Sequence, residues 1–142
     1  MSSKIEEIEG IGEVYGEKLR TADIKTVEDL LNICCDTDGR RNISEKTGLT
    51  EAQLLKWSHM ADLMTISGIG PEYSELLEAA GVATVKDLRR RVPAHLAAKM
   101  KEINEERKLT RAVPSEKEVT KWVDIAKDMD ERVCESGVFI KE

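Results

Sequence analysis

The stretch IEGIGEVYGEKLRTADIKTVEDL, residues 8–30, decides the fold because it recurs 58 residues later as ISGIGPEYSELLEAAGVATVKDL, residues 66–88. The two segments are identical at 12 of their 23 aligned positions. Each copy carries Gly-Ile-Gly followed by a short stretch with helical periodicity. The chain is therefore an internal duplication that contains two equivalent backbone turns.

The match resumes at LLKWSHMADLM, residues 54–64, against VTKWVDIAKDM, residues 119–129, with an offset of 65. The second copy thus holds seven extra residues, about two helical turns, before its Trp segment. We expect a first unit at 1–64, a second at 65–133 and a C-terminal tail at 134–142. Because no Pro- or Ser-rich linker separates the units, we expect them to be fused into one compact helical domain.

Composition favours a helical protein without a metal or membrane segment. Apolar residues make up 40% and charged residues 35% of the chain, no apolar run approaches the roughly 18 residues of a membrane span, and the start lacks signal-peptide features. These features predict a cytoplasmic protein. Cys34, Cys35 and Cys134 are odd in number and His59 and His95 stand alone, so we expect no metal site. Structural roles are favoured for the cysteines, with redox sensing or an intermolecular bridge through the vicinal pair as the alternative.

The periodicity predicts an all-α fold of about eight to ten short helices and no sheet. A helix after Gly12 is expected to end near Asp23 in the first copy and at Gly81 in the second. Thr26 and Thr84 each precede Val-x-Asp-Leu, a pattern that predicts a capping box and a second helix.

Two further kinds of helix are expected. Helices that contain Trp57 and Trp122 should begin at Thr50 and Ser115, and their apolar stripes favour core packing over the alternative of a partner groove or coiled coil. Proline fits the first turn of a helix, so Pro93 is expected to open another one. Its apolar face comprises Leu96, Met100 and Ile103.

The repeated turn resembles the helix-hairpin-helix motif. The residues that carry the resemblance are Gly10, Ile11, Gly12 and Glu13 in the first copy and Gly68, Ile69 and Gly70 in the second. The resemblance implies that the glycines permit a tight turn, that the isoleucine enters the core, and that amides opening the next helix face a phosphate or partner. It also implies that backbone carbonyls of such a hairpin could hold a monovalent cation.

The whole chain is similar to tandem helix-hairpin-helix modules of DNA repair, recombination and transcription proteins, and to a small bacterial family of tandem hairpin proteins of unassigned function. The same scaffold serves DNA contacts in some relatives and protein contacts in others. The resemblance therefore predicts the fold more directly than the partner.

Acidic residues around the turns oppose a phosphate contact. Glu9, Glu13 and Glu17 surround the first turn, and Glu72 and Glu75 follow the second. Each repeated segment has a net charge of −3, and the chain has −6. One carboxylate about 4 Å from a phosphate costs on the order of 1 kcal/mol in water, which is comparable to the roughly 0.3–1 kcal/mol that a helix N-terminus contributes.

Basic clusters provide the counterargument. The candidate contacts are Arg40, Arg41, Arg89, Arg90 and Arg91, followed by a further group at Arg107, Lys108 and Arg111. A single strip of these side chains could grip a nucleic-acid backbone, whereas scattered ones would be ordinary solvated charges. Base stacking is disfavoured because the two tyrosines lie on core-facing stripes.

No pattern indicates catalysis or a cofactor. The Gly-x-Gly turns lack the third glycine of a dinucleotide site and the Gly-Lys-Ser/Thr of a P-loop. We therefore expect a non-catalytic recognition module that binds a protein partner or self-associates, with Val138, Phe139 and Ile140 docking on a neighbour. The alternative is sequence-independent DNA or RNA backbone binding through the two hairpins.

Overall fold

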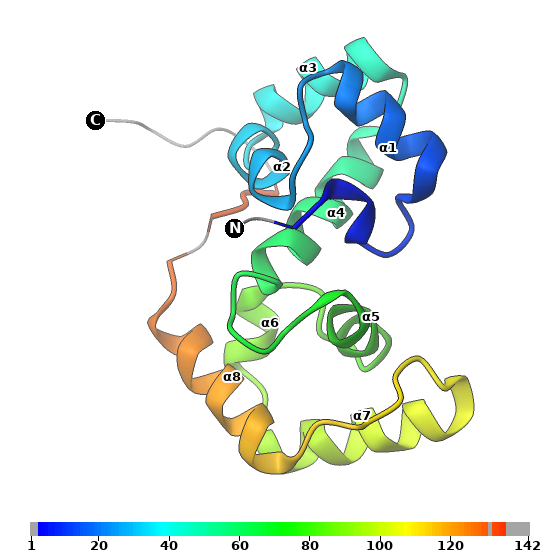
Figure 1. The fold of residues 1–142 in the computed structure, drawn as a ribbon. Coiled ribbons are helices and arrows are strands. Elements are labelled where there is room, and N and C mark those ends of the chain that lie inside the picture. The colour runs from blue at the N-terminus through cyan, green and yellow to red at the C-terminus, as the bar shows by residue number, and fades with distance from the viewer. Residues whose placement is uncertain (1–2, 131, 136–142) are drawn as a thin grey trace. The chain divides into compact units, whose positions relative to one another are not determined.

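The computed structural model describes residues 3–130 and 132–135 (Figure 1). These residues form eight α-helices and one 3-10 helix, and they contain no strand beyond an isolated bridge between Lys4 and Thr26. The all-α prediction is confirmed for this part of the chain. No helix within it is long and apolar enough to cross a membrane.

Contacts between residues divide the chain into two units. The described part of unit 1 is residues 3–62 together with 132–135, and that of unit 2 is residues 63–130. The division falls two residues before the boundary expected from the repeat. Residues 132–135 end the predicted second unit and begin the predicted tail, and in the structure they belong to unit 1. Fusion of the units into one body stays a prediction.

Unit 1 contains a 3-10 turn and four helices, and side-chain caps set the starts of α2, α3 and α4. The elements are η1 (Ile5–Glu7), α1 (Gly12–Thr21), α2 (Val27–Ile33), α3 (Thr37–Thr47) and α4 (Glu51–Leu63), which ends at the unit boundary. At α2 the Thr26 hydroxyl accepts a hydrogen bond from the Asp29 amide at 3.0 Å, and the Asp29 carboxylate accepts one from the Thr26 amide at 3.1 Å. This is the predicted capping box. Asp36 caps α3, and Gly48, at φ 79°, ends it.

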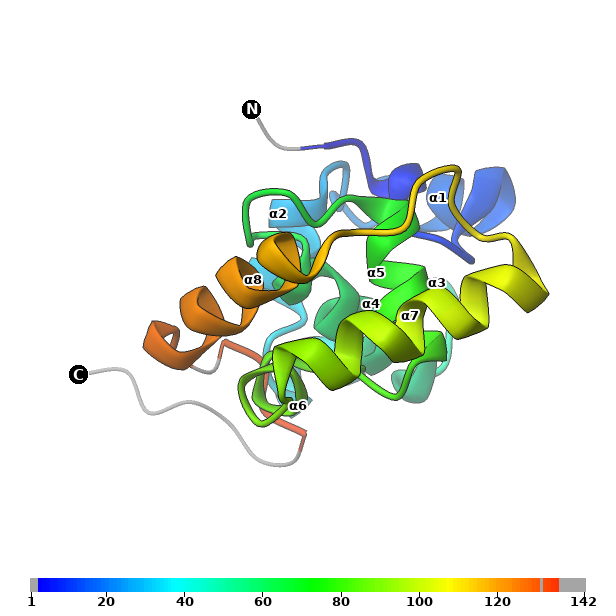
Figure 2. The same cartoon turned by 90° about the horizontal axis from the view of Figure 1, so that it is seen from below.

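Unit 2 repeats this order with α5 (Pro71–Ala79), α6 (Val85–Arg89), α7 (Pro93–Arg107) and α8 (Glu116–Asp128). Thr84 and Ser115 form the predicted capping boxes of α6 and α8. Helix α7 packs against α5 and α8, and the loop after α7 returns along it to α8 (Figure 2). Residues buried in the core of this unit come from all four helices.

The seven extra residues of the second copy are spread over three elements. Helix α7 is four residues longer than α3, the loop 108–115 is five residues longer than the loop 48–50, and α6 is two residues shorter than α2. The insertion therefore lengthens one helix and the loop that follows it. The Gly-Ile-Gly turn and the Trp helix are present in both copies.

The ends of α1 and α5 use the left-handed backbone conformation at matching positions. Asp23 has φ 65° where the second copy has Gly81 at φ 93°. This agrees with the predicted helix ends. Aspartate is among the few non-glycine residues that adopt this conformation at modest cost.

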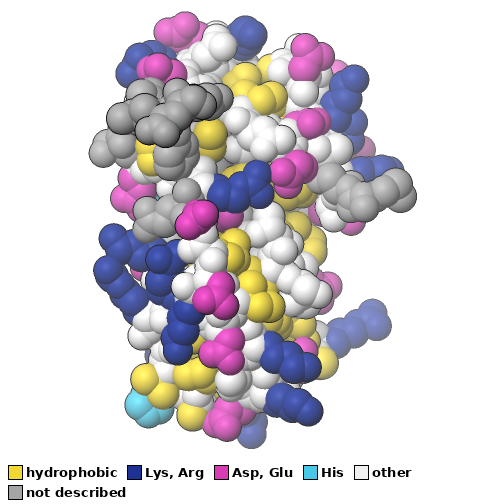
Figure 3. All heavy atoms as spheres, turned by 90° about the vertical axis from the view of Figure 1, so that its left-hand side faces the viewer, with side chains coloured by type: hydrophobic (Ala, Val, Ile, Leu, Met, Phe, Trp, Pro, Cys, Tyr) yellow, Lys and Arg dark blue, Asp and Glu magenta, His cyan; other side chains and the backbone are white. Residues whose placement is uncertain are grey.

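Charged side chains of both signs are interleaved over the face drawn in Figure 3, with apolar side chains between them. The predicted apolar stripes lie inside the units: Leu54, Trp57 and Ala61 of α4 are buried, as are Val119, Trp122 and Ala126 of α8. The core-packing interpretation of the Trp helices is thus confirmed.

Candidate functional site: the two Gly-Ile-Gly turns

The first turn places its apolar residues in the core and its glycines at the surface. The Ile11 amide donates a hydrogen bond to the Ile8 carbonyl at 3.2 Å, and both side chains are buried. Gly10 and Gly12 have φ values of 94° and 61°, which an L-residue adopts only with strain, and both are exposed. Glu13 follows them on the surface at the start of α1.

The second turn repeats this geometry up to its last glycine. The Ile69 amide donates to the Ile66 carbonyl at 3.0 Å, both isoleucines are buried, and Gly68 is exposed at φ 95°. Gly70 differs from Gly12 because it has an extended backbone, φ −96°, and acts as the N-cap of α5. Pro71 then opens the helix and has no N–H to offer.

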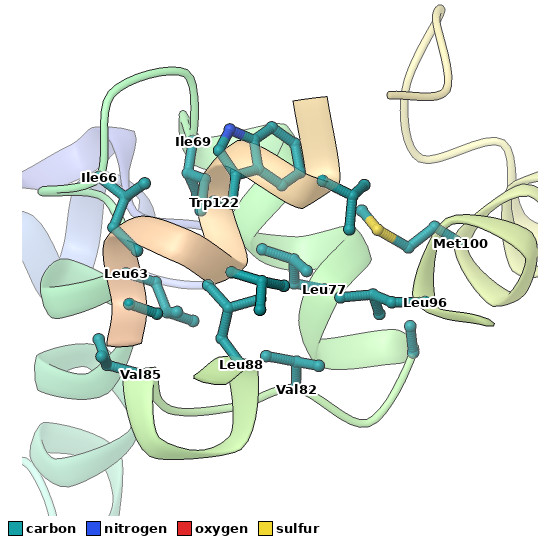
Figure 4. Packing of buried hydrophobic residues seen from close by; sticks show 14 of the residues in the cluster. Leu63, Ile66, Ile69, Leu77, Val82, Val85, Leu88, Leu96, Met100 and Trp122 are labelled. Atoms are coloured by element: carbon teal, nitrogen blue, oxygen red, sulfur yellow. The ribbon is translucent and has the colours of Figure 1, made fainter. Parts of the chain in front are cut away.

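A buried tryptophan lies beneath the first glycine of each turn. A Cβ atom added to Gly10 would lie 3.6 Å from Nε1 of Trp57, and one added to Gly68 would lie 3.0 Å from Nε1 of Trp122. Figure 4 shows Trp122 beside Ile66 and Ile69 in the core of unit 2. The close approach gives these glycines a second role besides their backbone angle. Sequence reasoning missed this contact, because each glycine is far from its tryptophan along the chain and no local pattern joins them.

A tyrosine completes the arrangement in both units. The ring centroids of Tyr15 and Trp57 are 5.6 Å apart, and those of Tyr73 and Trp122 are 5.4 Å apart. The Tyr73 hydroxyl donates to the Ala112 carbonyl at 3.0 Å, and burial raises the pKa of this phenol. Both tyrosines are half-buried, as the apolar stripes predicted, so their rings support the turns from within.

The helices that start at the turns lack side-chain caps. No side chain accepts a hydrogen bond at the N-cap of α1 or α5, whereas side chains cap α2, α3, α6 and α8. A helix N-terminus attracts negative charge. The first helical turn of each of these helices supplies that negative charge, because it contains an exposed acid, Glu13 in α1 and Glu72 in α5. Exposed Glu9 adds a second carboxylate to the first Gly-Ile-Gly turn.

An ion pair next to α1 explains why position 16 of this helix is a glycine. The Arg20 guanidinium donates two hydrogen bonds to Glu6, at 2.8 Å from Nε and 2.6 Å from Nη2. This pairing lowers the pKa of Glu6 to about 2. A Cβ on Gly16 would lie 2.6 Å from a Glu6 oxygen, so the glycine makes room for the carboxylate. At the matching position of the second copy, Ser74 is buried and its hydroxyl has no hydrogen-bond partner among the described residues.

Arg40 is not a surface contact, which corrects the sequence-based expectation. The residue is buried, with 2% of its surface exposed. Its guanidinium donates to the carbonyls of Cys34, Cys134 and Glu135. Because these carbonyls need the donor inside unit 1, the side chain cannot also reach a phosphate. Its neighbour Arg41 is exposed and lies 3.5 Å from Asp38.

The arginines after α6 are also partly engaged. Arg89 donates to the Met129 carbonyl at 2.9 Å, and Arg91 donates to the Ala80 carbonyl at 3.1 Å. Only Arg90 of the three is exposed. The three adjacent arginines therefore do not form one free basic strip, because two of them link elements of unit 2. The later group at Arg107, Lys108 and Arg111 is exposed.

The histidine of α4, the three cysteines and the predicted docking residues remain to be placed. His59 of α4 is 3.5 Å from the Glu135 carboxylate, and no disulfide joins any of the three cysteines. Across residues 3–130 and 132–135, no group of three or more His, Cys, Asp or Glu could hold a metal ion. The predicted docking residues Val138, Phe139 and Ile140 lie outside the described residues.

Together these features define an all-α protein with two exposed, acidic Gly-Ile-Gly turns, each backed by a Tyr–Trp pair. The chain belongs to the family described as domain of unknown function (DUF4332), whose model matches residues 9–129. That range spans both turns and both Trp helices. No curated protein and no solved structure matches the chain.

Proposed function

We propose that the chain is a non-catalytic tandem helix-hairpin-helix recognition module that binds a protein partner, or a second copy of itself, through its two Gly-Ile-Gly hairpins. The observation that carries the proposal is the charge of the exposed turns. Glu9, Glu13 and Glu72 are all at the surface there, while Arg40 is buried inside unit 1. A surface of this kind suits a basic or mixed partner better than a polyanion.

The size of the electrostatic effect favours protein over nucleic acid. Each carboxylate about 4 Å from a phosphate would cost about 1 kcal/mol in water. Two such groups at the first turn outweigh the roughly 0.3–1 kcal/mol that the helix N-terminus supplies. The alternative, sequence-independent DNA or RNA backbone binding through the hairpins, rests on the uncapped starts of α1 and α5.

An exposed apolar side chain gives the first hairpin a further feature of a protein-binding surface. Val14 is 68% exposed in the first turn of α1, and two exposed acids of the same helix, Glu13 and Glu17, lie on either side of it in the sequence. The second copy has Glu72 at the matching position. We therefore infer a partner surface that combines basic groups with a small apolar contact, and the first hairpin is the stronger site.

The direct test measures DNA binding and self-association of the purified chain. Labelled single-stranded, duplex and branched DNA are titrated by fluorescence anisotropy at roughly 50 and 200 mM salt, because phosphate contacts weaken steeply over that range. Light scattering in the same buffers reports the oligomeric state. The proposal predicts no DNA binding at low salt. Micromolar or tighter binding with a steep salt slope would establish the alternative instead.

Charge reversal separates the geometry of the hairpin from its charge. Glu9→Lys with Glu13→Lys replaces two repulsions by two attractions, about 4 kcal/mol before screening, which salt reduces to about half within a Debye length. DNA affinity should rise by roughly 30-fold relative to the control Glu102→Lys with Glu105→Lys, which makes the same charge change on exposed positions of α7. Equal gains in the two variants would show that the hairpin offers no phosphate site and would contradict its helix-hairpin-helix character.

Partner capture tests the protein-binding arm. A photo-crosslinking amino acid at position 14 is compared, in the native cells, with one at position 101, which is exposed on α7. The proposal predicts a discrete protein adduct at 14, none at 101, and loss of the adduct on Glu13→Lys. Nucleic-acid adducts at 14, or equal adducts at both positions, would count against it.

A further inference from the structure

We infer that Cys35 and Cys134 form an oxidative modification site, at which a reversible disulfide joins the segment 132–135 to the loop after α2, within unit 1. This inference does not depend on the proposed function. Figure 1 shows the segment beside α2, almost a hundred residues away from it along the chain. Neither thiol is in a disulfide in the structure.

Backbone geometry brings the two residues within bridging distance. The Cys134 amide donates a hydrogen bond to the Cys35 carbonyl at 2.8 Å. With standard bond lengths, this contact holds the two Cα atoms at most about 6.7 Å apart. Disulfides form at Cα separations of about 4.4–6.8 Å. The separation of the two Cα atoms therefore lies within the range at which a disulfide forms.

Four polar contacts, made by two arginines, hold the segment in place before any bridge forms. Arg40, buried in unit 1, donates to the carbonyls of Cys134 and Glu135. Arg132 lies 3.0 Å from the Glu28 carboxylate of α2 and also donates to the Asn32 side chain at 3.2 Å. Because these groups preposition Cys134, they raise its effective concentration next to Cys35.

Accessibility selects Cys35 over its neighbour Cys34. Cys35 and Cys134 are both partly exposed, so a small oxidant can reach them. Cys34 is fully buried, and burial raises its pKa to about 12, so it supplies almost no thiolate. The Cys35 thiol donates a hydrogen bond to the Asn32 carbonyl at 3.6 Å, and a thiol is a weak donor.

The chemistry balances with a low-molecular-weight disulfide, such as glutathione disulfide, as oxidant. One protein thiolate attacks it, forming a mixed disulfide and releasing one thiolate of the oxidant. The second protein thiolate then attacks the protein sulfur of that mixed disulfide and expels the other half. The protein loses two protons and two electrons, and the external disulfide becomes two thiols. The product is a covalent ring made of residues 35–134, a stretch of sequence that includes all of unit 2.

The experiment equilibrates the reduced full-length chain with reduced and oxidised glutathione, traps thiols by alkylation, and maps bridges by mass spectrometry of peptides. We expect a mass decrease of about 2 Da and one intramolecular Cys35–Cys134 link. Cys34→Ala should retain the bridge, whereas Cys35→Ser and Cys134→Ser should lose it. Circular dichroism checks that each variant folds, and the mapping in the unmodified chain needs no variant.

Arg132→Ala tests the prepositioning without removing a thiol. An exposed ion pair contributes about 0.2–1 kcal/mol, so the equilibrium constant for the bridge should fall by at most about fivefold, while Arg41→Ala leaves it unchanged. A Cys34–Cys35 bond, interchain bridges, stable glutathione adducts, or thiols that stay reduced while alkylation shows them accessible would each overturn the inference.

Discussion

Replacing Gly68 by alanine should destabilise unit 2 more than replacing Gly10 destabilises unit 1. Both glycines have nearly the same positive φ, 95° and 94°, so the backbone cost to an L-residue is similar. The difference lies beneath them. The new Cβ would be 3.0 Å from Nε1 of Trp122 at position 68, but 3.6 Å from Nε1 of Trp57 at position 10.

The expected magnitudes follow from two effects. Positive φ costs an L-residue about 1–2 kcal/mol, and a gain of about 0.4–1 kcal/mol from restricting the unfolded chain offsets part of it. Gly10→Ala should therefore cost about 1 kcal/mol. At Gly68 the indole must also move, and Trp122 is 2% exposed and packed against Tyr73, so overpacking adds about 1–3 kcal/mol.

Urea unfolding followed by tryptophan fluorescence measures the difference, because each unit contains one of the two tryptophans. Trp57→Phe leaves Trp122 as the reporter of unit 2, and the reverse substitution reports unit 1. A double-mutant cycle, followed by circular dichroism because Trp122 itself is replaced, then tests the cause: Trp122→Phe removes the contacting nitrogen and should reduce the cost of Gly68→Ala. Equal costs at the two glycines, or no coupling with Trp122, would refute the reasoning.

Two further outcomes are expected. Thr26→Ala and Thr84→Ala each remove a hydroxyl that accepts a hydrogen bond from the Asp29 or Asp87 amide at 3.0 Å, and each should lower the unfolding free energy by about 1 kcal/mol. A loss confined to one unit in urea unfolding would contradict the equivalence of the two capping boxes. The hydrogen bonds from Arg20 lower the folded pKa of Glu6 from 4.5 to about 2, so the stabilisation is present above pH 4.5 and is lost as the pH falls towards 2. Glu6→Gln should flatten this acid dependence in thermal melts, and an unchanged pH profile would show that the ion pair does not contribute.

Local sequence predicted the local features well. The capping boxes at Thr26, Thr84 and Ser115 depend on groups three residues apart, and all three form as expected. A helix likewise begins at Pro93, as predicted, and it ends at Arg107. These features involve only neighbours along the chain, so the residue types suffice to specify them.

The basic contacts were less predictable because exposure depends on neighbours that are distant in sequence. Arg40 and Arg41 are adjacent and chemically identical, yet one is buried and the other exposed. The difference arises because Arg40 has the carbonyls of Cys134 and Glu135, more than ninety residues away, as acceptors. A buried guanidinium is stable only when such acceptors are present, and no local pattern reveals them.

The sequence by itself determined the repeat, the all-α class, the positions of the two turns and their acidic character, since each follows from residue identity and short spacing. Only the tertiary structure placed Trp57 and Trp122 under the glycines, turned Arg40 inward and brought Cys134 to Cys35. The reason is physical. A helix can be predicted from the periodicity of its own residues, but the contacts between helices depend on packing between segments that are distant in sequence, and no local pattern shows that such segments meet.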